Sequence, residues 1–142
     1  MKPLQILALA GFLPMAAMAA DTLVTIPAEV ADPASFVWQK RPIVVFADTP
    51  DDPNFVRQID MLARDPAALE ERDVVVIIDS DPAARSAFRQ RLRPRGFSLV
   101  ILDKDGDPEL RKPLPWDVRE ITRAIDRFPL RRQEMLERRP GR

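Results

Sequence analysis

Two short runs of β-branched and aromatic residues constrain the fold of this chain most strongly. Residues 43–47 (IVVFA) and 74–78 (VVVII) are apolar throughout, which favours strands buried on both faces because a half-buried strand would alternate apolar and polar residues. Both runs are too short for a buried helix, and each leads through aspartate and proline into apolar residues at helical spacing. Two such strand–helix units predict parallel strands joined by right-handed crossovers in an α/β domain.

The helices that follow these strands have clear start signals. An Asp-Pro pair opens the first two, because Asp is a favoured N-cap and Pro is tolerated at the first helical position. Apolar residues recur on one side of each predicted helix, as a core-facing helix requires. The expected helical regions run from Pro53 to Leu69, from Pro82 to Leu92, and from Trp116-Asp117 to Phe128, where Pro129 follows.

A hairpin replaces a third strand–helix unit. Residues 97–102 predict a strand, residues 103–107 a tight turn with Asp105-Gly106 at its tip, and residues 109–112 a short returning strand. We therefore predict a thioredoxin-like α/β fold with a central mixed sheet of four to five strands flanked by helices. A flavodoxin-like sheet would need another strand–helix unit at the position of the hairpin.

The amino terminus predicts export. Lys2 precedes an apolar stretch from Leu4 to Leu13, and Ala17-Met18-Ala19 supplies a small-residue cleavage signal. The apolar stretch is short for a membrane span, which needs about 20 residues. We expect a periplasmic or extracellular protein without a transmembrane span after signal cleavage. The predicted organisation is a signal peptide at 1–20, an extended segment at 21–37, the domain at 38–130 and a basic tail at 131–142.

The composition excludes several chemistries. The 142 residues include no Cys, no His and no Tyr. Thiol–disulfide exchange, Ser-His and Cys-His nucleophile pairs and the usual zinc sites are therefore excluded. The 22 basic and 22 acidic residues balance, so nothing in the net charge points to nucleic acid as a partner. We expect no cofactor and assign no catalytic residue.

Arginines gather in two stretches of the chain. Residues 82–102 contain no acid but several arginines, and more follow from Arg127 onward. A basic face of this kind suits phosphate, lipid headgroups or an acidic protein, although surface arginines are also commonly solvated without any partner. In the first stretch these arginines are Arg85, Arg89, Arg91, Arg93 and Arg95.

Several motifs together resemble the family catalogued as domain of unknown function 4174. They are RPIVVFA, FVRQIDMLA, ERDVVVI, LVILDKDGDPELR and IDRFPLRRQEM. The resemblance implies a thioredoxin-like domain in an exported protein and no established activity, substrate or cofactor. In thioredoxins the loop after the first buried strand carries the redox cysteines, whereas here it is Asp48-Thr49-Pro50-Asp51-Asp52-Pro53. The place of the usual cis-proline falls at or next to Ser98, so the resemblance does not extend to redox function.

Two functions remain compatible with this pattern. The first is a non-catalytic module that binds an unknown protein or a cell-envelope component. The second is a carboxylate-based enzyme or divalent-cation site, because acids at the carboxyl ends of neighbouring parallel strands share a crevice; Asp48 and Asp79 would be its main participants. The acids could equally be helix caps and turn residues, and the tail arginines could pair with them or bind a partner. The candidate surface comprises Asp48, Thr49, Asp51, Asp52, Asp79, Asp81, Arg131 and Arg132.

Overall fold

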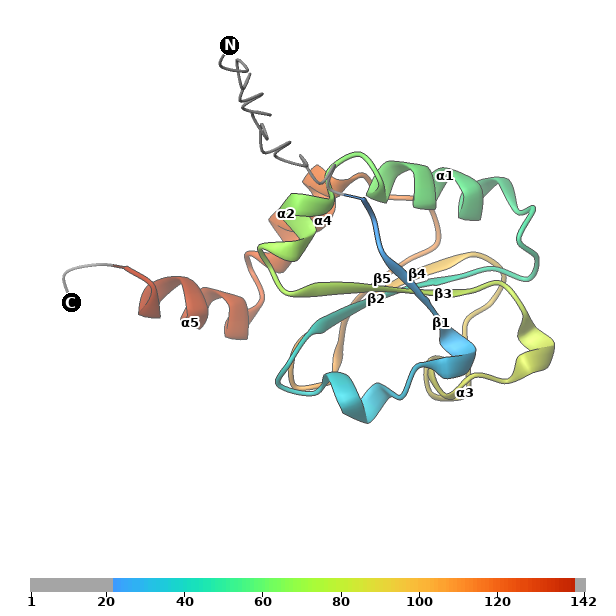
Figure 1. Cartoon of the computed structure of the whole chain (residues 1–142), viewed down its shortest axis with the longest axis horizontal. Helices are drawn as coiled ribbons and strands as arrows, with labels where there is room; N and C mark the ends of the chain where they lie inside the picture. Colours follow the sequence, from blue (N-terminus) through green and yellow to red (C-terminus); the bar gives the residue numbers. More distant parts are fainter. Residues whose placement is uncertain (1–21, 140–142) are drawn as a thin grey trace, which may run out of the picture.

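A five-stranded mixed sheet forms the centre of the molecule (Figure 1). The computed structural model describes residues 22–139, so the predicted signal peptide lies outside the described residues. The strands are β1 (Thr25–Pro27), β2 (Arg41–Phe46), β3 (Val74–Asp79), β4 (Ser98–Leu102) and β5 (Pro108–Lys112). Their order across the sheet is β1-β3-β2-β4-β5. The first three in this order run parallel, β4 is antiparallel to β2, and β5 is antiparallel to β4.

Helical segments cover both faces of the sheet. They are η1 (Ala28–Val30), η2 (Pro33–Phe36), α1 (Pro53–Leu62), α2 (Pro66–Glu70), η3 (Pro82–Ala84), α3 (Ala87–Leu92), α4 (Val118–Ile125) and α5 (Pro129–Glu137). Figure 1 shows α1, α2 and α4 on one face and η1, η2 and α3 on the other, with α5 beyond one end of the strands. The predicted α/β class and the mixed sheet flanked by helices are confirmed.

Each face of the sheet has its own apolar core. Alternate residues of β2 supply both, with Ile43 and Val45 packed in one cluster and Val44 and Phe46 in the other. The first cluster includes Leu62, Leu69, Ile121 and Ile125 from the helices, and the second includes Phe88 and Leu92. Burial on both faces is the physical reason that the two apolar runs lack polar alternation.

Two of the predicted helices are divided in the structure. The region from Pro53 to Leu69 breaks after Leu62, because Asp65 precedes Pro66 and adopts a non-helical backbone (φ −146°, ψ 70°) that caps α2. After β3, Asp81 and Pro82 begin only the 3-10 turn η3. The α-helix itself starts later, where the Ser86 hydroxyl accepts a hydrogen bond from the Arg89 backbone N–H.

The segment predicted as a basic tail is helical over much of its length. Pro129 occupies the first position of α5, so it starts this helix in addition to following α4. The helix continues to Glu137, and Arg131 within it is only 3% exposed. The extended segment also forms more structure than expected, since it contains β1 at the sheet edge. None of the helices within residues 22–139 is long and apolar enough to cross a membrane.

Candidate functional site

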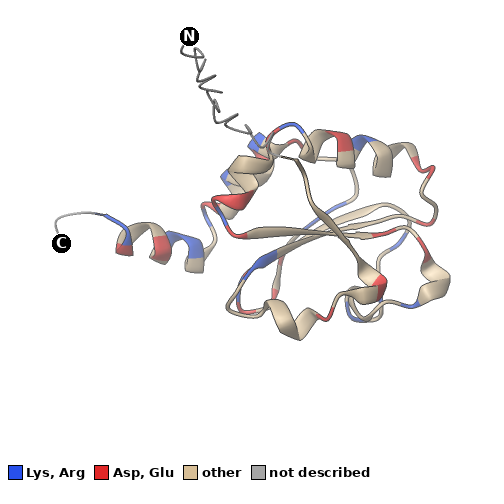
Figure 2. Cartoon of the chain, in the orientation of Figure 1, with Lys and Arg blue, Asp and Glu red and all other residues tan. Residues whose placement is uncertain are grey.

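The predicted acidic surface lies at the end of the sheet where β2 and β3 finish. We call residues 48–52 the aspartate loop; it joins β2 to α1 and forms an acidic segment before that helix (Figure 2). Asp48, Thr49 and Asp51 are exposed. Asp52 is the N-cap of α1, where its carboxylate accepts a hydrogen bond from the Asn54 backbone N–H at 2.8 Å. Asp52 therefore has a structural role, whereas the other three side chains are available to a partner.

Asp79, the last residue of β3, is not available in the same way. Its side chain is 1% exposed, and the Ser86 hydroxyl donates to Oδ2 at 2.5 Å. The Arg89 guanidinium donates to Oδ1 from Nε at 3.0 Å and from a terminal nitrogen at 2.7 Å. Both carboxylate oxygens are thus occupied by groups of α3 and its cap, which explains how a charged side chain is buried at this place.

Arg89 also fastens the ends of two strands together. One terminal nitrogen donates to the backbone carbonyls of Ala47 at 2.9 Å and of Asp79 at 3.2 Å. The guanidinium carbon lies 5.4 Å from the centroid of the Phe46 ring, within the range of a cation–π interaction. The strand end beside the aspartate loop is therefore a hydrogen-bonded support and not an open carboxylate cleft.

The carboxylate chemistry considered from the sequence is not assembled here. Asp81 is exposed and caps η3 by accepting from the Ala83 backbone N–H at 3.1 Å. Across the part of the chain that the structure describes, no three acidic side chains gather in an arrangement that could hold a metal ion. Asp48 and Asp79 do not form a shared acid/base pair with free oxygens, because those of Asp79 are already hydrogen-bonded. The pair of Asp48 and Asp79 on which the carboxylate hypothesis was based therefore does not present free oxygens from both residues.

The two tail arginines of the candidate surface differ sharply from each other. Arg131 is buried and forms ion pairs with Asp126 at 3.3 Å and with Glu134 at 3.4 Å. Arg132 is exposed, and its guanidinium has no ion pair or hydrogen bond within residues 22–139. The acids that Arg131 contacts belong to the end of α4, to α5 and, through Glu71 at 4.0 Å, to the end of α2. It does not pair with the acids of the strand ends.

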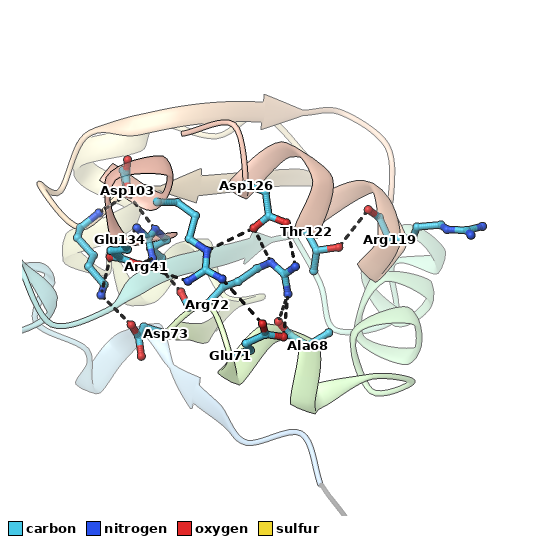
Figure 3. A network of polar contacts seen from close by, with 12 residues as sticks. Arg41, Ala68, Glu71, Arg72, Asp73, Asp103, Arg119, Thr122, Asp126 and Glu134 are labelled. Carbon is cyan, nitrogen blue, oxygen red and sulfur yellow. Dashed lines mark hydrogen bonds and ion pairs between the residues drawn. The ribbon is translucent and has the colours of Figure 1, made fainter. Parts of the chain in front are cut away.

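A second polar cluster, which the sequence patterns did not predict, lies at the opposite end of the sheet (Figure 3). Its centre is Arg41, the first residue of β2, whose side chain is fully buried. Arg41 donates to Asp103 at 2.9 Å and to the two carboxylate oxygens of Glu134 at 2.9 and 3.2 Å. We call the whole cluster the amino-end network; it comprises Arg41, Glu71, Arg72, Asp73, Asp103, Lys104, Asp126, Arg131 and Glu134.

Opposite charges alternate through the amino-end network. The Glu134 carboxylate forms ion pairs with both Arg41 and Lys104. The Lys104 ammonium lies 2.9 Å from Glu134 and 2.7 Å from Asp73. Partial burial by itself would raise the pKa of Glu134, but the hydrogen bonds from Arg41 and Lys104 outweigh it and lower the pKa to about 2. Asp126 is held in the same manner, because hydrogen bonds from Arg72 lower its pKa.

The network attaches α5 to the rest of the domain. Glu134 and Arg131 lie on α5, whereas Arg41 and Asp103 belong to the sheet and its adjoining turn. Every member of the network lies within one of the motifs on which the family resemblance depends. Those motifs were therefore the signal in the sequence from which the network residues could have been found. Sequence periodicity could not find these pairs, because an arginine at the start of a strand and an acid after one both look like ordinary strand boundaries.

Comparison with known proteins identifies a family for the chain but no activity. The model of the family described as "Domain of unknown function (DUF4174)" matches residues 32–134. No match to a curated protein was found. Among solved structures, one described as "Crystal structure of a designed protein" shares 20% identity with this chain at a TM-score of 0.48. That alignment covers 74% of this chain and 95% of the designed one.

Proposed function

The chain belongs to the DUF4174 family, and from this premise we propose that it is an exported, non-catalytic binding module with a thioredoxin-like arrangement. The partner, a protein or a cell-envelope component, docks at the aspartate loop. The observation that carries the proposal is the contrast at this end of the sheet. Asp48, Thr49 and Asp51 are exposed, while the neighbouring carboxylate of Asp79 is buried and fully engaged by Ser86 and Arg89.

The strand order supports the thioredoxin-like part of the proposal. A parallel pair of strand–helix units followed by an antiparallel hairpin is the arrangement that the sequence predicted, and β1-β3-β2-β4-β5 is compatible with it. Ser98, at the start of β4, pairs with Phe46 at the end of β2. The absence of cysteine from the whole sequence removes thiol–disulfide exchange at the loop. What remains of the arrangement is a surface for binding.

The charge of the loop indicates the chemistry of its partner. Asp48 and Asp51 are exposed carboxylates that follow the end of β2, so the partner surface is expected to carry lysine or arginine. Such contacts between exposed charges are screened by salt, over about 8 Å at physiological ionic strength. Binding should therefore weaken as salt concentration rises.

Photo-crosslinking in living cells tests the proposal. A photoreactive amino acid replaces Thr49, and the matched control carries it at Arg119, an exposed residue of α4. We expect a discrete protein adduct from position 49 that is absent from position 119 and is lost in Asp48→Asn/Asp51→Asn chains. No adduct at either position, or the same adducts at both, would refute docking at this loop. Amino-terminal sequencing of the exported chain tests localisation, with cleavage expected after Ala19 or Ala20.

A further inference from the structure

A hollow of about 420 Å³ lies at the same end of the sheet as the aspartate loop. We call it the arginine hollow; Arg93, Arg95, Phe97, Ser98, Arg111 and Pro113 line it. Ser98 opens β4 and pairs with Phe46, the residue that ends β2, which places the hollow near the carboxyl end of that strand. Its walls come from the end of α3, the start of β4 and the edge strand β5.

Three positive charges surround the hollow without any acid. Arg93 is the C-cap of α3, Arg95 follows it, and Arg111 projects from β5. Neither Asp nor Glu is among the lining residues, and within residues 22–139 none of the three arginines forms an ion pair. The buried arginines elsewhere, Arg41 and Arg131, have carboxylate partners. The arginine hollow therefore holds an uncompensated concentration of positive charge in a concave surface.

The arginine-rich stretch of the sequence divides into two functional groups. The Arg89 guanidinium donates to the Asp79 carboxylate, and that of Arg91 donates to the Gly106 carbonyl at 2.5 Å. These two side chains therefore stabilise the fold. Arg93 and Arg95 have no such commitments within the described part of the chain. Arg111 is partly fixed, since one terminal nitrogen donates to the Leu92 carbonyl at 2.6 Å. A guanidinium has five N–H donors, so most of those on Arg111 stay available.

Ser98 adds a polar group to the floor of the hollow. The residue is only 6% exposed, and its hydroxyl makes no hydrogen bond to any residue between 22 and 139. In the same range every fully buried polar side-chain atom has a hydrogen-bond partner. Because the Ser98 hydroxyl oxygen has none, it is not fully buried and must be accessible to solvent. Because Ser98 lines the hollow, that access is from the hollow itself. A largely buried and unpartnered donor among three arginines is an arrangement suited to an anion.

We propose that the arginine hollow binds the phosphate group of a small organic phosphate. Guanidinium groups match the oxygens of phosphate in a bidentate manner, and the Ser98 hydroxyl supplies a further donor. Three arginines without counter-ions favour a group with more than one negative charge, so a single carboxylate leaves more of the positive charge uncompensated. The hollow has the size of small-molecule sites, which range from about 300 to about 1,000 Å³. This site does not depend on docking at the aspartate loop.

Titration with defined phosphates tests the assignment. Glycerol 3-phosphate and inorganic phosphate are added at constant ionic strength while backbone amide NMR shifts of residues 93, 95–98 and 111 are followed. We expect saturable shifts and binding that weakens by about tenfold or more in Arg95→Gln and Arg111→Gln, as loss of a charged hydrogen bond implies. Arg119→Gln and Arg123→Gln, which change exposed arginines of α4, should retain wild-type affinity. Ser98→Ala should weaken binding without changing the dependence on salt.

Several results would overturn the proposal. They are a lack of saturation, an equal loss of affinity in the α4 variants, or acetate binding as tightly as phosphate. Arg111→Gln removes the contact to Leu92, but Arg95→Gln removes no contact, so a folding defect in the first variant leaves the second decisive. Sedimentation with phosphatidylglycerol vesicles, without saturable binding of glycerol 3-phosphate, would also overturn the proposal, because the lipid phosphodiester is not a small organic phosphate and carries a single negative charge. Saturable binding of glycerol 3-phosphate without sedimentation would assign the phosphate to a soluble ligand.

Discussion

The two ends of the sheet both pair an arginine with a buried carboxylate, but they do so over very different distances along the chain. At the carboxyl end of β3, Arg89 meets Asp79 only 10 residues away. At the amino end of β2, Arg41 meets Asp103 and Glu134, which are 62 and 93 residues away. The first pair stabilises one strand–helix unit, whereas the second fastens the last helix to the sheet. The first end also leaves exposed acids beside it, and the second leaves its charges internally paired.

The largest effect should come from the centre of the amino-end network. Replacing Arg41 with alanine leaves the buried Asp103 and the partly buried Glu134 without their main partner. Removing one member of a buried ion pair costs about 3–5 kcal/mol, so we expect a loss of about 4 kcal/mol in the free energy of unfolding. Denaturant unfolding measures it. The control Arg64→Ala breaks an exposed pair with Asp60 and should cost less than about 1 kcal/mol; equal losses would contradict a dominant role for Arg41.

The other end of the sheet provides the matching test. Arg89→Ala removes the partner of Asp79 and the contacts to two strand-end carbonyls. We expect a loss of about 3 kcal/mol, at the lower end of the range for buried pairs because Arg89 retains some exposure. Arg85→Ala, which changes an exposed arginine of the same segment, is the control. If Arg89→Ala cost more than Arg41→Ala, the long-range network would not be the stronger of the two.

The dependence of stability on pH should come mainly from the amino end. Folding lowers the pKa of Glu134 from 4.5 to about 2, so its ionised form stabilises the fold above about pH 4.5. That contribution, about 3 kcal/mol from about 1.4 kcal/mol per pKa unit, is lost as the pH falls from about 4.5 to about 2. Unfolding free energies of wild type and Glu134→Gln should therefore converge at low pH. A gap between wild type and Glu134→Gln that persists at pH 2 would refute the assignment.

The smallest predicted effect compares two adjacent arginines of α5. Arg131→Ala should cost about 2 kcal/mol, since its contacts to Asp126 and Glu134 are longer than those of Arg41. Arg132→Ala should change stability by less than about 0.5 kcal/mol because the side chain is exposed. Thermal unfolding of the two variants, at low and high salt, measures the difference. Similar losses would mean that α5 is not attached through Arg131.

The local parts of this structure could be predicted with some accuracy. Local sequence determines both buried strands, the hairpin and the helix caps at Asp52 and Asp81. The residues that predict each of these features therefore lie within a few positions of one another. The errors have local causes too. Asp65-Pro66 divides a helix whose apolar pattern continues through it, and Ser86 starts α3 later than Asp81-Pro82 suggested. Of the residues in the candidate surface, Asp48, Thr49 and Asp51 are exposed, whereas Asp79 and Arg131 are internal.

The sequence by itself determined the α/β class. The spacing of apolar residues and the helix-start signals distinguish buried strands from core-facing helices. The sequence also determined which chemistries are excluded, since a chain without cysteine or histidine cannot supply their side chains. Only the tertiary structure decided which charged side chains form ion pairs within the fold and which remain accessible to a partner. Arg41 and Glu134 are 93 residues apart, and no periodic pattern links them. Folding brings them together and leaves Arg93, Arg95 and Arg111 without carboxylates in the described chain.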